Sequence, residues 1–372
     1  MKNDPKDERF MRLALRLAQK GKGLTSPNPM VGAVVVKGGA VVGTGYHHRA
    51  GEPHAEVLAL RQAGEKAKGA TLYLNLEPCD HFGRTPPCTR AILKAGVQRL
   101  VAGMKDPNPL VSGRGIKRLK EAGVRVEVGV CKEACQELNA AFIKGMTTGT
   151  PWVILKAAVS LDGKTATRSG DSRWISSGTS RRQVHRLRRR VDAVMVGIGT
   201  VRRDDPLLNI RLPGKSPARQ PLRVVIDSRL RISPASRIVR TAEAFPTLVV
   251  TTPAAPADKR NKLKKAGVKV LVTRGDRRGR VKLRPLMREL RRMGIQSVLL
   301  EGGPTLNAGA LEERIVDRIL LFVAPKIVGG REAPQMVGGE GVWRMKNARQ
   351  AEILRVRRIG PDLMIEAKPR YG

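Results

Sequence analysis

Apolar residues in the first 150 positions recur with two spacings, one typical of helices and one typical of strands. Over residues 8–20 they fall every three or four positions and stop at Gly21-Lys22-Gly23, which predicts an amphipathic helix. The apolar run 31–36 is followed by Gly38-Gly39 and by a second run at 40–45. Two short apolar runs joined by glycines are typical of a β-hairpin. The chain is therefore predicted to begin with a helix and a hairpin.

The same two spacings continue to residue 144 and predict alternating helices and strands. Pro53 introduces a helical pattern over 54–63, and Cys88 begins another. The other expected elements are strands at 70–76, 99–102 and 124–128 and helices at 115–122 and 132–144. Strands that alternate with helices in this way favour a layered α/β domain.

The second half of the chain repeats this alternation after a break at Thr147-Thr148-Gly149-Thr150-Pro151. We place a domain boundary at the break, so that residues 1–148 form one domain and residues 149–372 another. Strands are expected in the second domain at 152–159, 193–196, 222–226, 247–251, 268–272, 297–300 and 319–324. Helical patterns separate several of them, which favours an α/β fold with a largely parallel sheet.

Histidine and cysteine gather in one short stretch. Residues 47–88 contain four of the five histidines and two of the four cysteines. His54, Cys79 and Cys88 supply one imidazole and two thiolates, and three protein ligands with a fourth position open to water are typical of a catalytic zinc. Glu56 stands two residues after His54, where its carboxylate reaches such a water rather than the metal. It is therefore predicted to act as the general acid and base.

His54-Ala55-Glu56 followed by Pro78-Cys79 matches the signature of the zinc nucleobase deaminases. Those enzymes usually show Cys-x-x-Cys, whereas eight residues separate Cys79 from Cys88 here. The alternative is a free thiol pair near an unrelated core histidine. It requires the two parts of the signature to co-occur by chance. We therefore expect a zinc-dependent deaminase site.

Charge and composition bear on the partners. The net charge of +39 suits nucleic acid or acidic, phosphorylated substrates. The arginines are spread along the second half, and aromatic residues, on which bases stack, make up only 3%. Phosphorylated small molecules, and no nucleic acid, are therefore the expected partners.

The sequence also bears on the compartment. The first residues lack the apolar core of a signal peptide, and no run of eighteen apolar residues exists, so we expect a cytoplasmic protein without a membrane span. Cys131 and Cys135 are expected to be small buried hydrophobic residues, and a reducing compartment suits all four cysteines.

Two glycine-rich turns follow predicted strands in the second half. Residues 196–201 precede Asp204-Asp205-Pro206, and residues 301–306 open a helical pattern. Glycine turns that lead into helices suit phosphate groups, and the pair predicts a nucleotide site. Each turn alone is more typical of an ordinary tight turn, and neither is the full Gly-x-Gly-x-x-Gly of a Rossmann site. The arginine-rich stretch 181–190 is interpreted as a solvated helix face.

The whole pattern resembles the bifunctional deaminase/reductase family of riboflavin biosynthesis. In the first half the resemblance rests on Pro27-Asn28-Pro29-Met30-Val31-Gly32, Gly51-Glu52-Pro53-His54-Ala55-Glu56, and Glu77-Pro78-Cys79 with the long spacing to Cys88. In the second half it rests on Lys156-Ala157-Ala158-Val159-Ser160-Leu161-Asp162-Gly163-Lys164, Ser172-Arg173-Trp174-Ile175-Ser176, Asp204-Asp205-Pro206, Val225-Ile226-Asp227-Ser228 and Glu301-Gly302-Gly303-Pro304-Thr305. The resemblance covers essentially the whole chain.

This resemblance implies a cytidine-deaminase-like α/β/α domain followed by a dihydrofolate-reductase-like α/β domain. The first, with one Zn²⁺ per chain, would hydrolyse the 2-amino group of 2,5-diamino-6-ribosylamino-4(3H)-pyrimidinone 5′-phosphate. The second would reduce the ribosyl side chain of the product to ribityl with NADPH. The family alone suggests a homo-oligomer.

The resemblance also assigns residues. His54, Cys79 and Cys88 match the zinc ligands and Glu56 the proton shuttle, while Asn28, His47 and His81 match positions that line the pyrimidine pocket. The matches to nucleotide-contacting positions are Ala158, Trp174, Thr200, Asp204, Ser228, Gly303, Pro304, Thr305, Leu306, Asn307, Ala308 and Gly309. The matches to substrate-contacting positions are Ser172, Arg188, Leu207, Arg211 and Glu301. The forked guanidinium groups of Arg188 and Arg211 suit a phosphate. Asp80 stands where the family leads us to expect a serine.

Two other interpretations remain open at this point. In the first interpretation, the protein is a deaminase of tRNA or single-stranded nucleic acid with a basic binding half, and its affinity for RNA depends strongly on salt. In the second interpretation, one of the two domains has lost its catalytic activity and only supports the other domain structurally.

Overall fold

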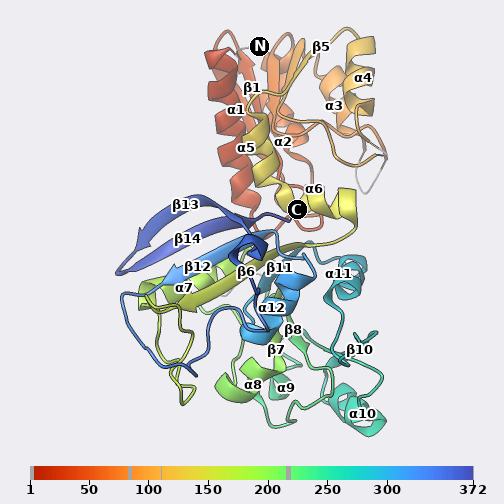
Figure 1. The fold of residues 1–372 in the computed structure, drawn as a ribbon. Coiled ribbons are helices and arrows are strands. Elements are labelled where there is room, and N and C mark those ends of the chain that lie inside the picture. The colour runs from red at the N-terminus through yellow and green to blue at the C-terminus, as the bar shows by residue number, and fades with distance from the viewer. Residues whose placement is uncertain (1–3, 83–85, 110, 215–218, 372) are drawn as a thin grey trace. The chain divides into compact units, whose positions relative to one another are not determined.

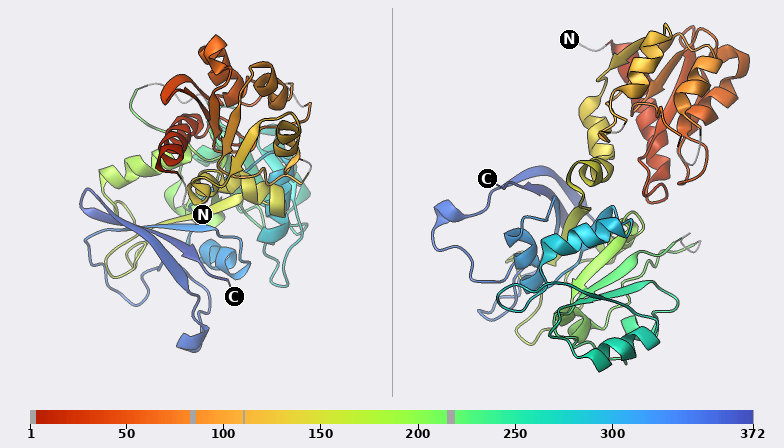
Figure 2. Two further views of the ribbon diagram at one scale, coloured as in Figure 1. Left: turned by 90° about the horizontal axis from the view of Figure 1, so that it is seen from above. Right: turned by 90° about the vertical axis from the view of Figure 1, so that its right-hand side faces the viewer.

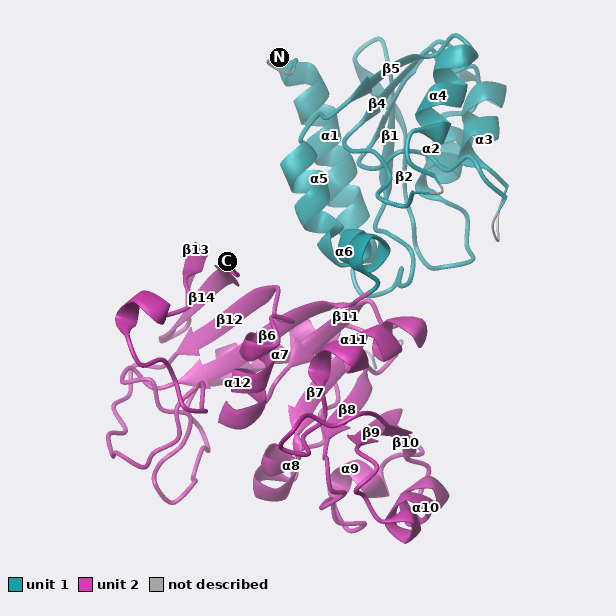
Figure 3. Ribbon diagram, turned by 45° about the vertical axis from the view of Figure 1, so that its right-hand side comes forward, with its two compact units in different colours: residues 1–149 teal, residues 150–372 magenta. Residues whose placement is uncertain are grey.

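The chain forms two compact units in the computed structural model, Met1–Gly149 and Thr150–Gly372 (Figure 3). The structure describes residues 4–82, 86–109, 111–214 and 219–371. Each unit is built on its own sheet with helices against it (Figures 1 and 2). None of the helices in these ranges has both the length and the apolar character that crossing a membrane requires.

The first unit has a five-stranded sheet in the order β2-β1-β3-β4-β5. β1 pairs antiparallel with β2 and β3, and β3, β4 and β5 run parallel. The strands are β1 (Gly32–Lys37), β2 (Ala40–Tyr46), β3 (Thr71–Leu74), β4 (Arg99–Ala102) and β5 (Arg125–Val128). The helices are α1 (Pro5–Ala18), α2 (Ala55–Ala63), α3 (Cys88–Lys94), α4 (Arg114–Glu121), α5 (Lys132–Leu138) and α6 (Ala140–Thr148), with short 3₁₀ turns at Gln19–Gly21 and Gly64–Ala67.

Helices cover both faces of this sheet because successive strand side chains point to opposite sides. Ala33 and Val35 of β1 join the core that contains α2, α3 and α4. Val34 and Val36 join the core that contains α1, α5 and α6. The unit is therefore a three-layer α/β/α sandwich, as expected.

The second unit has a nine-stranded sheet in the order β10-β9-β8-β7-β11-β6-β12-β14-β13. The strands from β10 to β12 in this order run parallel, and β14 and β13 are antiparallel additions at one edge. The strands are β6 (Trp152–Val159), β7 (Ala193–Gly197), β8 (Leu222–Ile226), β9 (Thr247–Thr251), β10 (Lys269–Val272), β11 (Ser297–Leu300), β12 (Arg318–Val323), β13 (Ala351–Ile359) and β14 (Asp362–Pro369). The helices are α7 (Gly178–Arg188), α8 (Ile198–Asp204), α9 (Arg237–Arg240), α10 (Ala257–Lys265), α11 (Leu283–Arg292) and α12 (Pro304–Glu312), and a 3₁₀ turn lies at Met345–Asn347.

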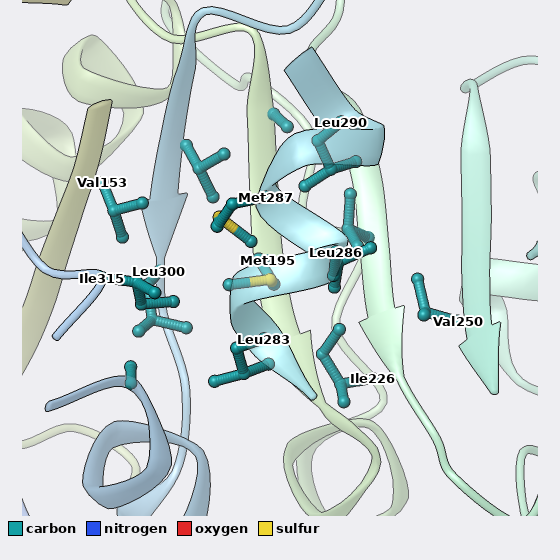
Figure 4. Packing of buried hydrophobic residues seen from close by; sticks show 14 of the residues in the cluster. Val153, Met195, Ile226, Val250, Leu283, Leu286, Met287, Leu290, Leu300 and Ile315 are labelled. Carbon is teal, nitrogen blue, oxygen red and sulfur yellow. The ribbon is translucent and has the colours of Figure 1, made fainter. Parts of the chain in front are cut away.

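The core of this unit also has two sides. On one side α11 lays Leu283, Leu286, Met287 and Leu290 over the strands, where Met287 lies beside Met195 (Figure 4). On the other side the strands pack against side chains of α8, α9 and α10. Because the strands from β10 to β12 run parallel, their carboxyl ends all lie at one edge of the sheet.

The predicted strands agree with the structure to within about two residues, and the helix expected at 8–20 is observed as α1 at Pro5–Ala18. Three further differences concern the site and the topology. The helix expected at 54–63 begins at Ala55, so His54 is its N-cap. The helix expected at 132–144 is broken at Asn139, whose buried side chain binds both the N–H and the C=O of Met30. The hairpin of β13 and β14 was not predicted, because nearly every residue of β13 is exposed and carries no apolar run.

Candidate zinc and nucleotide sites

The three predicted zinc ligands meet in the first unit. His54 is the N-cap of α2, Cys88 is the first residue of α3, and Cys79 lies in the segment after β3. The ligand atoms, His54 Nδ1 and the two Sγ atoms, all lie within 4.8 Å of one another. His54 Nδ1 is 3.2 Å from Cys88 Sγ and 3.6 Å from Cys79 Sγ.

These separations fit a tetrahedral zinc. With Zn–N and Zn–S bonds of usual length, a tetrahedral angle places nitrogen and sulfur about 3.5 Å apart. The N–H of Cys88 lies 3.4 Å from Cys79 Sγ, as a second-layer bond to a metal thiolate should. The donor set of one nitrogen and two sulfurs is typical of a zinc site with an open position.

The protonation of the ligands is linked. Hydrogen bonding with Cys88, and then with His54, lowers the pKa of Cys79 to about 4, although burial opposes it. The bond to Cys79 raises the pKa of His54, and the neighbouring Cys79 raises the pKa of the Cys88 thiol. A metal ion replaces the shared protons when it binds, because zinc takes thiolates and neutral imidazole.

Glu56 lies beside the ligands and is almost fully buried. Its Oε2 has no hydrogen-bond partner in the part of the chain that the structure describes. Burial raises the pKa of Glu56, and the neighbouring His54 opposes that effect. A buried carboxyl with an unsatisfied oxygen next to an open metal position is suited to exchanging protons with a bound water.

Two of the three residues predicted to line the pyrimidine pocket also lie next to this site. Asn28 Nδ2 is 3.0 Å from His47 Nε2, and the His47 ring packs edge-on against His54 at a centroid distance of 5.2 Å. Burial lowers the pKa of His47, so its Nε2 can accept from the amide. His81, by contrast, is exposed. The structure therefore brings together Asn28, His47 and His54 but leaves His81 at the surface.

The sequence offered no role for Glu77, which holds the segment before Cys79. Its buried carboxylate accepts three backbone N–H groups, from Asp106 and Gly113 on Oε2 at 3.0 and 2.9 Å and from Ile116 on Oε1 at 3.2 Å. Asp80, where a serine was expected, accepts from Thr89 Oγ1 at 2.5 Å. The sequence does contain a signal for Glu77: it is an acidic residue directly before Pro78-Cys79 in an otherwise largely apolar, buried stretch, which indicates a carboxylate with partners inside the protein.

In the second unit the predicted nucleotide residues follow the carboxyl ends of parallel strands. Ala158 lies near the end of β6, Thr200 and Asp204 lie on α8 after β7, Ser228 follows β8, and the segment 303–309 opens α12 after β11. Parallel α/β sheets bind ligands at this edge. These residues therefore lie at the edge of the sheet where the parallel strands end.

The two glycine turns come together because β7 and β11 are neighbours in the sheet. A Cβ on Gly303 would lie 3.6 Å from Thr200 Oγ1, and a Cβ on Gly197 would lie 3.7 Å from Leu306 Cβ. Gly197 and Gly303 are the N-caps of α8 and α12, and neither helix has a side-chain cap. The first N–H groups of both helices are therefore available to phosphate oxygens, which fits a dinucleotide.

The structure corrects the reason given for Arg188. Its fork is committed to Glu301, with Nε to Oε1 at 2.7 Å and Nη2 to Oε2 at 3.0 Å, and Nη1 donates to the carbonyl of Asn209 at 3.0 Å. Both side chains are about nine-tenths buried. All three guanidinium nitrogens of Arg188 are therefore engaged by groups of the protein itself, and the stretch 181–190 is only partly a solvated face.

The other predicted residues lie in loops around this edge. Trp174 is 60% exposed, with the Arg181 guanidinium 4.3 Å from its ring centroid, and Ser172 precedes it in the same loop. The carbonyl of Leu207 accepts from the fully buried Arg223 at 3.2 Å. Arg211 is exposed, and its N–H donates to His185 Nδ1 at 3.1 Å. Neither His185 nor the partly buried Lys156 was assigned a role from the sequence: His185 stands in no motif, and Lys156 only opens the stretch 156–164 that carries the resemblance.

Comparison with known families agrees with this division. The family model described as the cytidine and deoxycytidylate deaminase zinc-binding region matches residues 4–104, and the RibD C-terminal domain matches residues 151–365. The fold and the sites thus define a zinc-dependent deaminase-type unit followed by a reductase-type unit, which confirms the predicted fold class.

The relatives span the whole chain. The riboflavin biosynthesis protein RibD of Aquifex aeolicus is 46% identical over 98% of this chain and 99% of its own length, and that of Escherichia coli K12 is 43% identical over 96% and 98%. A solved structure of Acinetobacter baumannii RibD has a TM-score of 0.89 at 39% identity, covering 98% of this chain and 99% of that one. The chain belongs to the RibD family.

Proposed function

We propose that the protein catalyses two successive steps of riboflavin biosynthesis, a zinc-dependent deamination in the first unit and an NADPH-dependent reduction in the second. The curated relatives are named riboflavin biosynthesis proteins. A Thermotoga maritima structure with 35% identity and a TM-score of 0.85 is described as a diaminohydroxyphosphoribosylaminopyrimidine deaminase and 5-amino-6-(5-phosphoribosylamino)uracil reductase. Full-length similarity of this kind supports the same pair of reactions here.

In the first unit His54, Cys79 and Cys88 would hold one Zn²⁺, which supplies the Lewis acidity that makes water a nucleophile at neutral pH. Glu56 takes a proton from the attacking water and delivers it to the departing amine. The carbon–nitrogen bond to the 2-amino group breaks as a carbon–oxygen bond forms, and ammonia leaves. Asn28 and His47 orient the pyrimidine beside this carboxyl.

In the second unit the N-termini of α8 and α12 would bind the phosphates of NADPH. Ala158, Trp174, Asp204 and Ser228 would contact the nucleotide as well. The substrate, held by Ser172, Leu207, Arg211 and Glu301, would accept a hydride at the first ribosyl carbon, the ring carbon–oxygen bond would open, and the freed oxygen would take up a proton. Hydride transfer needs no protein nucleophile, so the contribution of the chain is orientation and electrostatics. Arg188 acts here through Glu301, whose carboxylate it fixes.

The proposal depends above all on one observation, the three ligand atoms with the unsatisfied oxygen of buried Glu56 beside them. It also takes the enzyme to be cytoplasmic and to bind no nucleic acid, as the sequence predicts, and to be a homo-oligomer, as the resemblance suggests. Light scattering on the purified protein tests the oligomeric state, and an RNA-binding titration at two salt concentrations tests the absence of nucleic-acid binding.

The catalytic test compares the wild type with Glu56→Gln, which keeps the size of the side chain but removes its base. Metal content, ammonia release and NADPH absorbance are followed on the same preparation. The wild type should hold one zinc per chain, release ammonia and then consume NADPH. Glu56→Gln should keep its zinc, lose at least about a hundredfold in ammonia release, and consume NADPH only when given the deaminated intermediate. Tight RNA binding without either reaction would overturn the proposal.

A further inference from the structure

The loop that carries Arg211 is held by side chains rather than by secondary structure. Residues 206–212 form neither helix nor strand. The carbonyl of Asn209 accepts from Arg188, the N–H of Ile210 donates to Gln220 Oε1 at 2.8 Å, and the N–H of Arg211 donates to His185 Nδ1 at 3.1 Å. Three consecutive residues are thus each fixed by one side-chain hydrogen bond.

Arg211 is the guanidinium in this loop that remains available to a ligand. Its side chain is exposed and makes no hydrogen bond or ion pair within the described ranges. Arg188, in contrast, has all three guanidinium nitrogens engaged. The positive charges of Arg188 and Arg237 lie near Arg211, an arrangement that an anion between them relieves.

His185 and Arg188 lie three residues apart on α7 and so share one face of the helix. That face holds the loop at two points, through the Asn209 carbonyl and the Arg211 N–H. Burial and the charges of Arg188 and Arg211 lower the pKa of His185 to about 4, against the opposing effects of Glu301 and the Asn209 backbone. The imidazole is therefore neutral at physiological pH, with Nδ1 as an acceptor.

We propose that His185 is a positioning residue of the reductase site: by accepting the Arg211 N–H, it places the Arg211 guanidinium where the 5′-phosphate of the substrate binds. This inference rests on the reductase function proposed above. It assigns phosphate recognition to Arg211, whose backbone His185 holds in place, rather than to the guanidinium of Arg188.

Three substitutions separate the hydrogen bond from the bulk of the ring. In His185→Asn the amide oxygen occupies nearly the position of Nδ1 and can accept the Arg211 N–H. In His185→Gln the amide reaches the position of Nε2 instead, and His185→Ala removes the acceptor. Arg186→Ala is the matched control, because it removes an exposed charge from the neighbouring position of the same helix.

The first readout is NADPH oxidation with the deaminated intermediate and with its form lacking the 5′-phosphate. His185→Ala and His185→Gln should raise KM for the phosphorylated substrate about 3- to 10-fold, the worth of one hydrogen bond, with little change in kcat. His185→Asn and Arg186→Ala should stay near the wild type. With the phosphate-free substrate all variants should match the wild type.

The second readout does not depend on turnover. Calorimetric binding of ribose 5-phosphate, compared with ribose, is measured for the same variants and for Arg211→Gln. Arg211→Gln should weaken the binding of ribose 5-phosphate but not of ribose. The double variant His185→Ala/Arg211→Gln should bind ribose 5-phosphate no more weakly than Arg211→Gln alone. Equal losses for both sugars, or His185→Asn no better than His185→Gln, would overturn the inference. Selective ribose 5-phosphate binding without NADPH oxidation by the wild type would instead contradict the proposed reduction while leaving the role of His185 supported.

Discussion

Replacing Glu77 with glutamine should loosen the zinc site without touching a zinc ligand. The Glu77 carboxylate is buried and accepts the N–H groups of Asp106, Gly113 and Ile116, which belong to the segment that runs from the end of β4 into the first turn of α4. Glu77 also stands two residues before Cys79. The hydrogen bonds therefore tie this segment to the chain that delivers the thiolate.

The magnitude follows from the geometry. Oε2 accepts two of the N–H groups and Oε1 accepts the third. A glutamine amide has only one oxygen, so whichever way it turns at least one buried N–H faces an NH₂ group. The loss of one acceptor, together with the loss of the negative charge at the two remaining hydrogen bonds, should cost about 2–4 kcal/mol of local stability. Local opening should then become about 30-fold more frequent or greater.

Hydrogen exchange measured on peptides covering residues 104–118 tests this expectation, with zinc retention against a chelator as the second measurement. Glu77→Gln should speed exchange of the three amides and release zinc sooner. Glu121→Gln is the control, because Glu121 is exposed on α4 and its loss should change stability by less than about 0.5 kcal/mol. If Glu77→Gln exchanges and holds zinc like the wild type, the reasoning is wrong.

Two further substitutions test buried charges elsewhere. Burial raises the pKa of Asp7, but hydrogen bonds from Arg99 and Tyr73 outweigh it and hold the pKa below 3.8, so this stabilisation is present at neutral pH and is lost as the pH falls through the folded-state pKa. Asp7→Asn should therefore cost about 3–5 kcal/mol at pH 7, measured by denaturant unfolding. The cost should shrink as the pH falls through the folded-state pKa of Asp7, and a cost that stays constant over the acid range contradicts this. Arg223 is fully buried and donates to Thr247 and to several carbonyls. Arg223→Lys keeps the charge but cannot reach these acceptors, and should lower the free energy of unfolding by about 3–5 kcal/mol; a loss below about 1 kcal/mol would refute the assignment.

Much of the fold was predictable from local patterns. Short continuous apolar runs marked nearly every buried strand, because a strand covered on both faces must be apolar over its whole length. β13 was not predicted, for the converse reason. It is an exposed edge strand with Arg355, Arg357 and Arg358 along it, and such a strand needs no apolar pattern. The helix expected at 132–144 was interrupted by a tertiary contact, the pairing of Asn139 with Met30 across 109 positions.

The zinc site was more predictable than the reductase site. Its ligands are chemically distinctive, and their residue types and spacing indicate a metal wherever the chain folds. Arginine is common in this chain, so its positions carry little information. Arg188 was expected to bind phosphate, yet the structure pairs it with Glu301, 113 positions away.

The sequence by itself determined the periodicity of the strands and helices, the identity of the metal-binding side chains and the glycine turns, because each of these depends on residues near one another in the chain. Only the tertiary structure decided which polar groups satisfy one another: Glu77 with three backbone amides, Arg188 with Glu301, and His185 with Arg211. A buried hydrogen-bonding group takes the partner that folding brings within about 3 Å, and no local pattern records which partner that is.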